Sequence, residues 1–230
     1  MILCIETATG VCSVALCDDN SVISVLEAPA GMSHSSSLTV LIKELLRGAS
    51  IEARQLDAVS VSKGPGSYTG LRIGVSVAKG IAYGAEIPLI GINTLTAMCH
   101  GYLMAYPFPA DSSILLCPMI DARRMEVYNA LFTVDGRMIQ ETSADIITAS
   151  SYSDRLESEK IIFFGNGAGK CRSAITGPNA IFEEGFSLSA SYLHKPSVNA
   201  FREKQFEDVA YFEPYYLKEF IATIPKKLFL

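Results

Sequence analysis

An α/β fold made of two similar halves is predicted by the order of apolar and amphipathic segments along the 230 residues. Three short apolar strands are followed by helix, strand, helix, strand and helix, and the same order begins again after a pause at Tyr106-Pro107-Phe108-Pro109. Alternating strands and helices are typical of α/β proteins. Hydrophobic residues make up 49% of the chain, and this length can fill one large core or two small ones.

The first half opens with predicted strands at 2–6, 12–17 and 22–26, which are separated by clusters of turn-forming residues. A helix follows, because five apolar residues recur at the spacing of one helical face. Ser33 is its expected N-cap, and Gly48 is expected to stop it. The apolar face consists of Leu38, Leu41, Ile42, Leu45 and Leu46.

The rest of the chain repeats this alternation of strands and helices. The first half is completed by a strand at 56–62, a helix at 68–83, a strand at 88–92 and a helix at 94–104. In the second half, Asp135-Gly136 marks a hairpin between two strands. We expect strands at 114–120, 126–134 and 138–140, a weak helix at 151–157, a strand at 160–164, a short helix after the glycines at 165–170, a strand near Ala180 and a helix near Leu188.

Two successive halves of order βββαβαβα predict a duplicated ribonuclease-H-like fold, the architecture of actin, Hsp70 and sugar kinases. We expect a first subdomain at 1–106 and a second at 107–230, and we leave open a return of the last residues to the first subdomain. This architecture does not by itself assign a function.

Charge and composition argue against several functional classes. The net charge is −5 and no dense run of Lys or Arg occurs, so nothing resembles a nucleic-acid footprint, and contact with RNA is expected only indirectly. No apolar run approaches the roughly 18 residues of a membrane span, and the basic start of a signal peptide is missing. Six scattered cysteines form no Cys-x-x-Cys pair, which favours reduced thiols in the cytoplasm, and with three distant histidines they show no zinc spacing.

The segment from Lys63 to Gly74 carries the strongest local signal. A glycine-rich turn between a strand and a helix brings backbone N–H groups to a helix N-terminus, which suits an anion. The spacing fits neither nucleotide fingerprint, because Leu71 follows Gly70 where a Walker loop needs Lys, and Thr69 stands where the dinucleotide motif needs Gly. A tight turn with a capped helix behind it is the simpler interpretation.

A stripe of small residues follows that turn at intervals of four. Glycine inside a helix costs about 0.5–1 kcal/mol relative to alanine, so two glycines on one face need a reason. Close packing on the chain's own sheet and contact with a partner helix both remain open. The stripe consists of Gly70, Gly74, Ala78 and Ala82.

Two other polar clusters receive structural interpretations. The glycines at 165–170 fail as a Walker loop, because Phe164 and Cys171 occupy positions that need Gly and Ser or Thr. His34, beside the serines at 35–37, is the only Ser/His cluster. We interpret it as the polar start of a helix rather than as a hydrolase site.

Four segments, in order along most of the chain, resemble the TsaB (YeaZ) family. The first is the most specific signature and the last is the weakest. The segments are Gly64-Pro65-Gly66-Ser67-Tyr68-Thr69-Gly70-Leu71-Arg72, the opening Ile5-Glu6-Thr7-Ala8-Thr9 with Cys12-Ser13-Val14-Ala15-Leu16, Asp121-Ala122-Arg123-Arg124-Met125-Glu126-Val127-Tyr128, and Glu213-Pro214-Tyr215-Tyr216-Leu217.

The resemblance implies a bacterial, cytosolic, non-catalytic partner of TsaD, which transfers a threonylcarbamoyl group to the adenosine beside the anticodon in tRNAs reading ANN codons. An ATPase, TsaE, completes that complex, and the family also pairs with itself. The family makes these contacts through its first two helices. The resemblance therefore favours contact with a partner helix as the role of the small-residue stripe. The implied interface residues are Leu38, Leu41, Ile42, Leu45, Gly70, Leu71, Gly74, Ala78 and Ala82.

Departures from TsaD point to lost chemistry. Where TsaD-like chains carry a metal-binding His-x-x-x-His pair, this sequence has Thr94 and Met98, whose hydroxyl and thioether are poor replacements for imidazole. Actin-like phosphate hairpins usually carry the motif Asp-x-Gly-x-Thr. This sequence has Glu6-Thr7-Ala8-Thr9 there, without the glycine that lets phosphate approach. We therefore expect no catalytic, metal or cofactor-binding residues. A free-standing actin-like enzyme, a glycoprotease-like peptidase or a small-molecule kinase, is the alternative.

Overall fold

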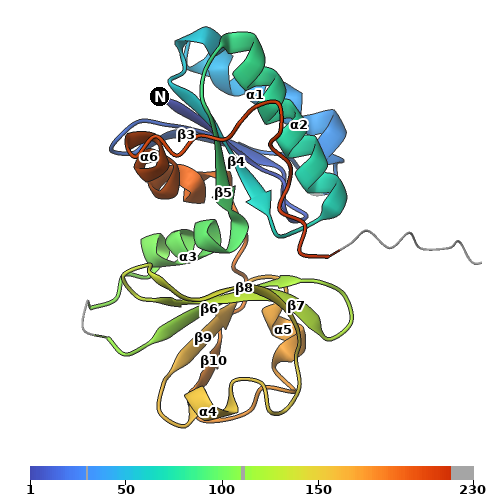
Figure 1. Cartoon of the computed structure of the whole chain (residues 1–230), viewed down its shortest axis with the longest axis vertical. Coiled ribbons are helices and arrows are strands. Elements are labelled where there is room, and N and C mark those ends of the chain that lie inside the picture. The colour runs from blue at the N-terminus through green and yellow to red at the C-terminus, as the bar shows by residue number, and fades with distance from the viewer. Residues whose placement is uncertain (30, 110–111, 219–230) are drawn as a thin grey trace, which may run out of the picture.

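Two five-stranded sheets, each with helices beside it, make up the protein in this computed structural model, which describes residues 1–29, 31–109 and 112–218. Figure 1 shows the two sheets one above the other, with helix α3 (Thr94–Ala105) at their junction. The halves follow each other along the chain, as the sequence predicts.

The first sheet is organised around β1 (Ile2–Glu6), which pairs antiparallel with β2 (Ser13–Cys17) and parallel with β4 (Ala58–Gly64). The outer strands are β3 (Val22–Glu27) and β5 (Leu89–Asn93), which gives the order β3-β2-β1-β4-β5. All residues of β1 and β2 are buried, whereas those of β3 alternate between half-buried and exposed, as suits a strand at a sheet edge.

The second sheet repeats this topology. Its order is β10-β9-β6-β7-β8, with two antiparallel pairs on one side of β6 and two parallel pairs on the other. The same connectivity in both halves confirms the predicted duplicated ribonuclease-H-like fold. The strands are β6 (Leu115–Asp121), β7 (Glu126–Thr133), β8 (Met138–Ile146), β9 (Ile161–Phe164) and β10 (Ala180–Phe182), and the short helices are α4 (Ser153–Leu156) and α5 (Ala168–Cys171).

Helices α1 (His34–Gly48) and α2 (Tyr68–Ala85) lie side by side on one face of the first sheet (Figure 1). The Ser33 side chain caps α1 by accepting from the Ser36 N–H, and α1 ends at Gly48, so both predicted ends are confirmed. Ser67 caps α2 by accepting from the Gly70 N–H. The polar residues before each apolar stripe therefore define where the helices begin.

The chain returns to the first half after β10. A 3-10 turn at Ala190–Leu193 and helix α6 (His194–Arg202) pack on the face of the first sheet opposite α1 and α2, in place of the single helix predicted near Leu188. Residues 203–218, which we call the strap, then run along the first half (Figure 1). Residues 219–230 of the expected second subdomain lie outside the described residues.

Strand β8 is longer than the predicted 138–140. Its second part, which contains Glu141, Ser143 and Asp145, has little intrinsic strand preference. It nevertheless pairs with the first residues of β7, so tertiary pairing overrides local propensity. Among the described residues no helix is both long and apolar enough to cross a membrane.

Candidate functional site

The hairpin between β1 and β2 stands where actin-like proteins hold phosphate, and its carboxylate is sealed in the protein. Glu6 has no exposed surface. Its carboxylate accepts hydrogen bonds from the Ala8 N–H at 2.5 Å and from the Ser62 hydroxyl. Burial raises the pKa of the Glu6 carboxyl to about 7, against the lowering effect of these hydrogen bonds. Glu6 is therefore a structural acid without access to a substrate.

The glycine-rich turn and the start of α2 pack directly on that hairpin. A Cβ atom on Gly66 or Gly70 would lie less than 3.0 Å from the backbone of Ala8 or Thr7. The Thr7 hydroxyl donates to the Gly70 carbonyl at 2.8 Å, and the Ser67 N–H donates to the Ala8 carbonyl at 2.7 Å. The glycines are needed for close approach of two backbone segments, which favours the tight-turn interpretation of the motif.

The contact between the two halves beside this hairpin is apolar and filled. Ala8 and Leu71 of the first half share one buried cluster with Ile120 and Phe164 of the second half. Met98 of α3 belongs to the same cluster, and its methyl group lies against Gly165. The space between the halves beside the hairpin is therefore occupied by the chain's own side chains.

The two positions that hold metal ligands in TsaD-like chains are also interior. Thr94 and Met98 are both buried at the start of α3. The Thr94 hydroxyl has no hydrogen-bond partner among the described residues, and a lone hydroxyl beside a thioether is a weak ligand set. Within the described part of the chain, no group of three His, Cys, Asp or Glu side chains is placed to hold a metal ion.

The structure corrects the residues assigned to a partner interface. All nine are buried inside the chain: the leucines and isoleucine of α1 and the alanines of α2 belong to the core of the first half, and Gly70 and Gly74 face Thr7. The 3.6-residue period was identified correctly, but it marks the inner faces of the two helices. The corrected residues are Leu38, Leu41, Ile42, Leu45, Gly70, Leu71, Gly74, Ala78 and Ala82.

The outer face of α2 carries a second row of small residues that the sequence analysis missed. Ser76, Gly80 and Gly84 are exposed and lie four residues apart. A Cβ atom on Gly80 or Gly84 would meet nothing within 4 Å, so the chain's own packing does not require these glycines. Tyr83 on α2 is 81% exposed, and Val40 on the neighbouring α1 is 51% exposed. This outer face is open, and its small and apolar residues lie among exposed charged residues: Lys43, Glu44 and Arg47 on α1 and Arg72 on α2.

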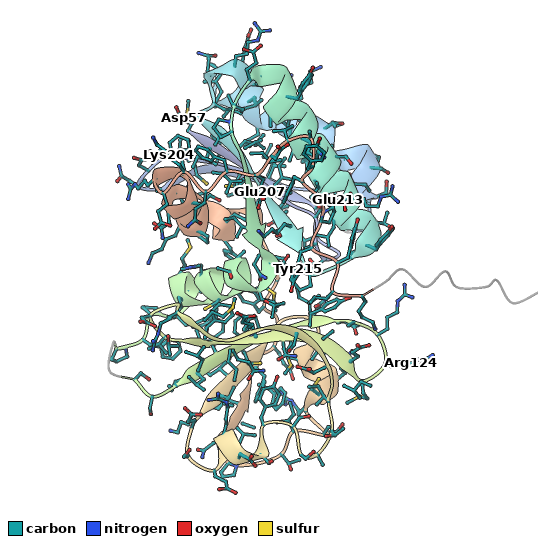
Figure 2. All side chains as sticks on the ribbon, viewed as in Figure 1. Asp57, Arg124, Lys204, Glu207, Glu213 and Tyr215 are labelled. Carbon is teal, nitrogen blue, oxygen red and sulfur yellow. The ribbon has the colours of Figure 1, made fainter. Side chains whose placement is uncertain are left out.

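The strap joins the first and last motifs at one edge of α2. The Tyr215 N–H donates to the Lys63 carbonyl at 2.6 Å, and the ring of Tyr216 lies 4.8 Å from that of Tyr68. The Arg72 guanidinium lies 5.6 Å from the centre of the Tyr68 ring. Figure 2 shows Tyr215 at the junction of the halves. Only the folded chain reveals that these two motifs form one surface.

The third motif forms the turn between β6 and β7 and meets the end of the strap. The Lys218 ammonium pairs with the Glu126 carboxylate, and the Lys170 ammonium pairs with the Asp121 carboxylate. Lys170 also donates to the Glu126 carbonyl at 2.6 Å. The Arg123 N–H donates to Asp121 at 2.8 Å, so this carboxylate anchors the turn. Three motifs distant in sequence are therefore neighbours in space.

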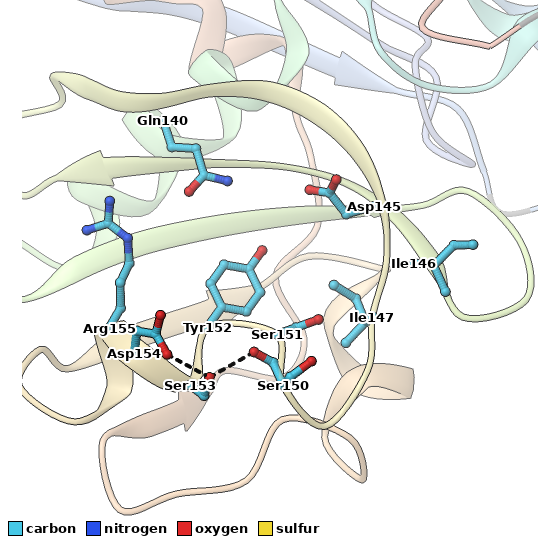
Figure 3. A pocket seen from close by; sticks show the side chains of 10 residues that line it. All are labelled: Gln140, Asp145, Ile146, Ile147, Ser150, Ser151, Tyr152, Ser153, Asp154 and Arg155. Carbon is cyan, nitrogen blue, oxygen red and sulfur yellow. Dashed lines mark hydrogen bonds between the residues drawn. The ribbon is translucent and has the colours of Figure 1, made fainter.

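The polar groups of His34 and of a pocket in the second half form hydrogen bonds within the chain itself. The His34 ring nitrogen Nε2 lies 3.0 Å from the Thr9 carbonyl and 3.1 Å from that of Val11, so the ring braces the hairpin. A pocket of about 430 Å³ lies beside Asp145 and Tyr152, and Figure 3 shows the side chains that line it. Their polar atoms are tied together through Asn129, at 2.7 and 2.9 Å. In the pocket the Ser153 hydroxyl donates to the Asp154 carboxylate at 3.1 Å, and at neither place does a serine hydroxyl bond to a histidine within the described residues.

Comparison with known proteins gives a consistent result. A family model described as TsaD, tRNA N6-adenosine threonylcarbamoyltransferase, matches residues 27–224. The tRNA threonylcarbamoyladenosine biosynthesis protein TsaB of Escherichia coli strain K12 is 36% identical over 146 residues, which span 62% of this chain and 61% of that protein. The TsaB of Bacillus subtilis strain 168 is 29% identical over 223 residues, which span 94% and 93%.

A solved structure from Pseudomonas aeruginosa, described as an uncharacterized protein with similarity to peptidase YEAZ, has the same fold. Its TM-score is 0.82 at 21% identity, and the match covers 94% of this chain and 99% of that one. The family model covers most of the chain, and the TsaB relatives match it in sequence. The chain therefore belongs to the TsaD family and, within it, to the TsaB (YeaZ) group.

Proposed function

We propose that this chain is a non-catalytic subunit that supports a TsaD-type enzyme in transferring a threonylcarbamoyl group to the adenosine beside the anticodon of tRNAs reading ANN codons. The observation that carries the proposal is the filled contact between the halves. Ala8, Leu71, Ile120 and Phe164 occupy the place where an actin-like enzyme would open a nucleotide cleft. A protein of this family whose own cleft is closed can still support threonylcarbamoyl transfer by binding the enzyme that catalyses it.

The residues near that contact support the same proposal. Glu6 is the most perturbed carboxyl near the hairpin, but it has no exposed surface through which to act on a substrate. Thr94 and Met98 lack the donor chemistry of a metal pair. The alternative of a free-standing peptidase or kinase therefore gains no support from these positions. All six cysteines are unpaired and buried, which fits our placement of the protein in the reducing cytoplasm.

The outer face of α1 and α2 is the surface that we propose for the TsaD-type partner. Gly80 and Gly84 cost helix stability without serving the chain's own packing, and close approach of another backbone would explain them. Tyr83 and Val40 supply exposed apolar area beside them. The same face is open to a second copy of the chain, so self-pairing and pairing with TsaD should compete. The ATPase TsaE would join through the complex.

Reconstitution tests the role of the chain. The chain, a TsaD-type transferase, a TsaE-type ATPase, ATP, a threonylcarbamoyl donor and an ANN-reading tRNA are combined with one component omitted at a time. We expect transfer only when the chain and the transferase are both present, and no ATP hydrolysis or proteolysis by the chain alone. Full transfer without the chain, or turnover that increases with the amount of chain alone, would contradict the proposal.

Gly80→Leu tests the surface. An isobutyl group at this close approach should cost about 1–3 kcal/mol of pairing free energy, roughly a 5- to 150-fold loss in affinity, while the melting temperature of the isolated chain should not fall, because leucine favours the helix more than glycine does. Gly80→Ala is the matched control, because it adds only a methyl group and should raise helix stability. Unchanged affinity of the leucine variant, measured by calorimetric titration with the transferase, would move the partner surface elsewhere.

A further inference from the structure

The turn between β6 and β7 carries more positive than negative charge. Arg123 and Arg124 are both exposed, and neither forms an ion pair within residues 1–29, 31–109 and 112–218. The two acids of the turn, Asp121 and Glu126, are instead paired with Lys170 and Lys218. The turn is therefore locally cationic in a chain whose net charge is −5.

The backbone of this turn is unusual for arginine. Arg123 has a φ of 73° and Arg124 a φ of 50°, which places both in the left-handed region that glycine and asparagine adopt most readily. Two adjacent arginines keep an unfavourable conformation at an exposed position where smaller residues would be less strained. Strain of this kind at a surface turn indicates that the side chains serve something outside the fold.

The cationic turn continues into the surface made by the strap. Lys218, which pairs with Glu126, follows two residues after Tyr216, whose ring lies tilted against that of Tyr68, which is itself beside Arg72. Tyr216 keeps 38% of its surface exposed. Figure 2 shows Arg124 on the side of the second half toward which the strap descends from Tyr215. The exposed guanidinium groups of the turn thus lie toward the same side as the exposed ring of Tyr216, whose neighbour Tyr68 is half-buried.

We propose that Arg123 and Arg124 bind the phosphodiester backbone of the RNA substrate, with the Tyr68–Tyr216 pair offering a stacking surface for an unpaired base. The proposal rests on the proposed function, because the RNA would be presented by the complex. Two guanidinium forks suit adjacent phosphates, and aromatic rings beside them are typical of contacts to unpaired RNA. An acidic protein surface is the competing occupant of the arginines.

This proposal departs from the expectation that the chain contacts RNA only indirectly. A charge of −5 spread over the chain predicts no binding of RNA by the chain alone, and that expectation stays. Local pairing of Asp121 and Glu126 with lysines leaves the arginines free to act once a partner has brought RNA to this side. The contact therefore depends on the complex.

The test measures tRNA affinity of the assembled complex over a range of KCl concentrations. The main variant is Arg123→Asn/Arg124→Gly, which removes both guanidinium groups and installs residues suited to the left-handed backbone. Arg123→Lys/Arg124→Lys keeps the charges. Arg172→Gln/Arg202→Gln removes two exposed arginines elsewhere and is the matched control for net charge.

We expect the Asn/Gly variant to bind tRNA about 25-fold more weakly at 0.1 M salt, with a slope of log K against log salt shallower by about 1.4, because each phosphate contact in single-stranded RNA contributes about 0.7 to that slope. The Lys variant should keep the slope, and the Gln control should match the wild type. Tyr216→Ala should weaken binding without changing the slope, since stacking releases no counterions.

Each other outcome overturns the proposal. An unchanged slope for the Asn/Gly variant means that no phosphate contact was lost. Loss of pairing with the transferase in a titration without RNA means that the arginines bind an acidic protein surface. A marked fall in the melting temperature means that they hold the fold. Failure of the wild-type proteins to pair in that same titration would instead refute the proposed function.

Discussion

A Cβ atom on Gly74 would lie less than 3.0 Å from the Oγ1 atom of Thr7. Thr7 is fully buried after β1, and its hydroxyl donates to the Gly70 carbonyl one turn earlier in α2 at 2.8 Å. Thr7 thus contacts α2 at two successive turns.

Gly74→Ala should destabilise the isolated chain. The added methyl group overlaps the Thr7 hydroxyl, and overpacking in a buried contact costs about 1–3 kcal/mol. At this chain length, 1 kcal/mol corresponds to about 2–4 °C in melting temperature. In a Thr7→Ala background the same change should cost less, because the obstructing atoms are gone. Equal costs in both backgrounds, measured by thermal melts as a double-mutant cycle, would show that Thr7 is not the obstacle.

Glu6 should make the chain less stable as the pH rises. Burial raises the pKa of its carboxyl from 4.5 to about 7, so the folded chain holds the proton more tightly than the unfolded chain. Its contribution to the free energy of unfolding is complete below pH 4.5 and falls by about 3 kcal/mol as the pH reaches 7. Glu6→Gln should remove that fall. Urea unfolding between pH 4.5 and 8 measures it, and a variant with the wild-type profile would contradict the assignment.

His100 should make the chain more stable as the pH rises, which is opposite to the effect of Glu6. Burial, and then the charge of Lys195, lowers the pKa of its imidazole from 6.5 to about 4. The stability that this neutral ring contributes is present above pH 6.5 and is lost as the pH falls toward 4. The two residues therefore offset each other between pH 4.5 and 6.5. In the same urea series, His100→Gln should make stability fall more steeply with rising pH, and an unaltered slope would exclude this residue.

Two neighbouring residues of the strap should respond very differently to truncation. Phe212 is 8% exposed and packs into the core of the first half, whereas Tyr211 is 84% exposed. Phe212→Ala should cost about 3 kcal/mol of unfolding free energy, and Tyr211→Ala less than about 0.5 kcal/mol. Chemical unfolding of both variants provides the comparison. Equal effects would mean that the strap is not anchored through Phe212.

Local patterns were sufficient to predict most of the fold. Apolar alternation, Ser33 as a cap and the repeated order of elements predicted two halves whose sheets have the same topology. The polar second part of β8 was missed because its pairing with β7 depends on residues already folded beside it. Strand propensity describes only the residues of the strand and not the neighbouring strand with which they pair.

The candidate site was less predictable, for a geometric reason. The spacing of Gly70 and Gly74 revealed a close approach but could not say what approached. The folded chain shows that Thr7, more than sixty residues away in sequence, approaches both glycines. Gly80 and Gly84 are also glycines four residues apart, but they lie on the opposite, exposed side of α2. Residues 213–217 of the strap were recognised as a motif, but their position beside Tyr68 required the folded chain.

The return of α6 and the strap has a consequence for how the chain is made. The second sheet, from Leu115 to Phe182, is one uninterrupted stretch, whereas the first sheet needs residues from both sides of that stretch. On a ribosome, the second sheet can fold while one face of the first still waits for Val198 and its neighbours. The half that begins synthesis is thus the last to be completed, and its uncovered face is the natural place for a chaperone to bind meanwhile.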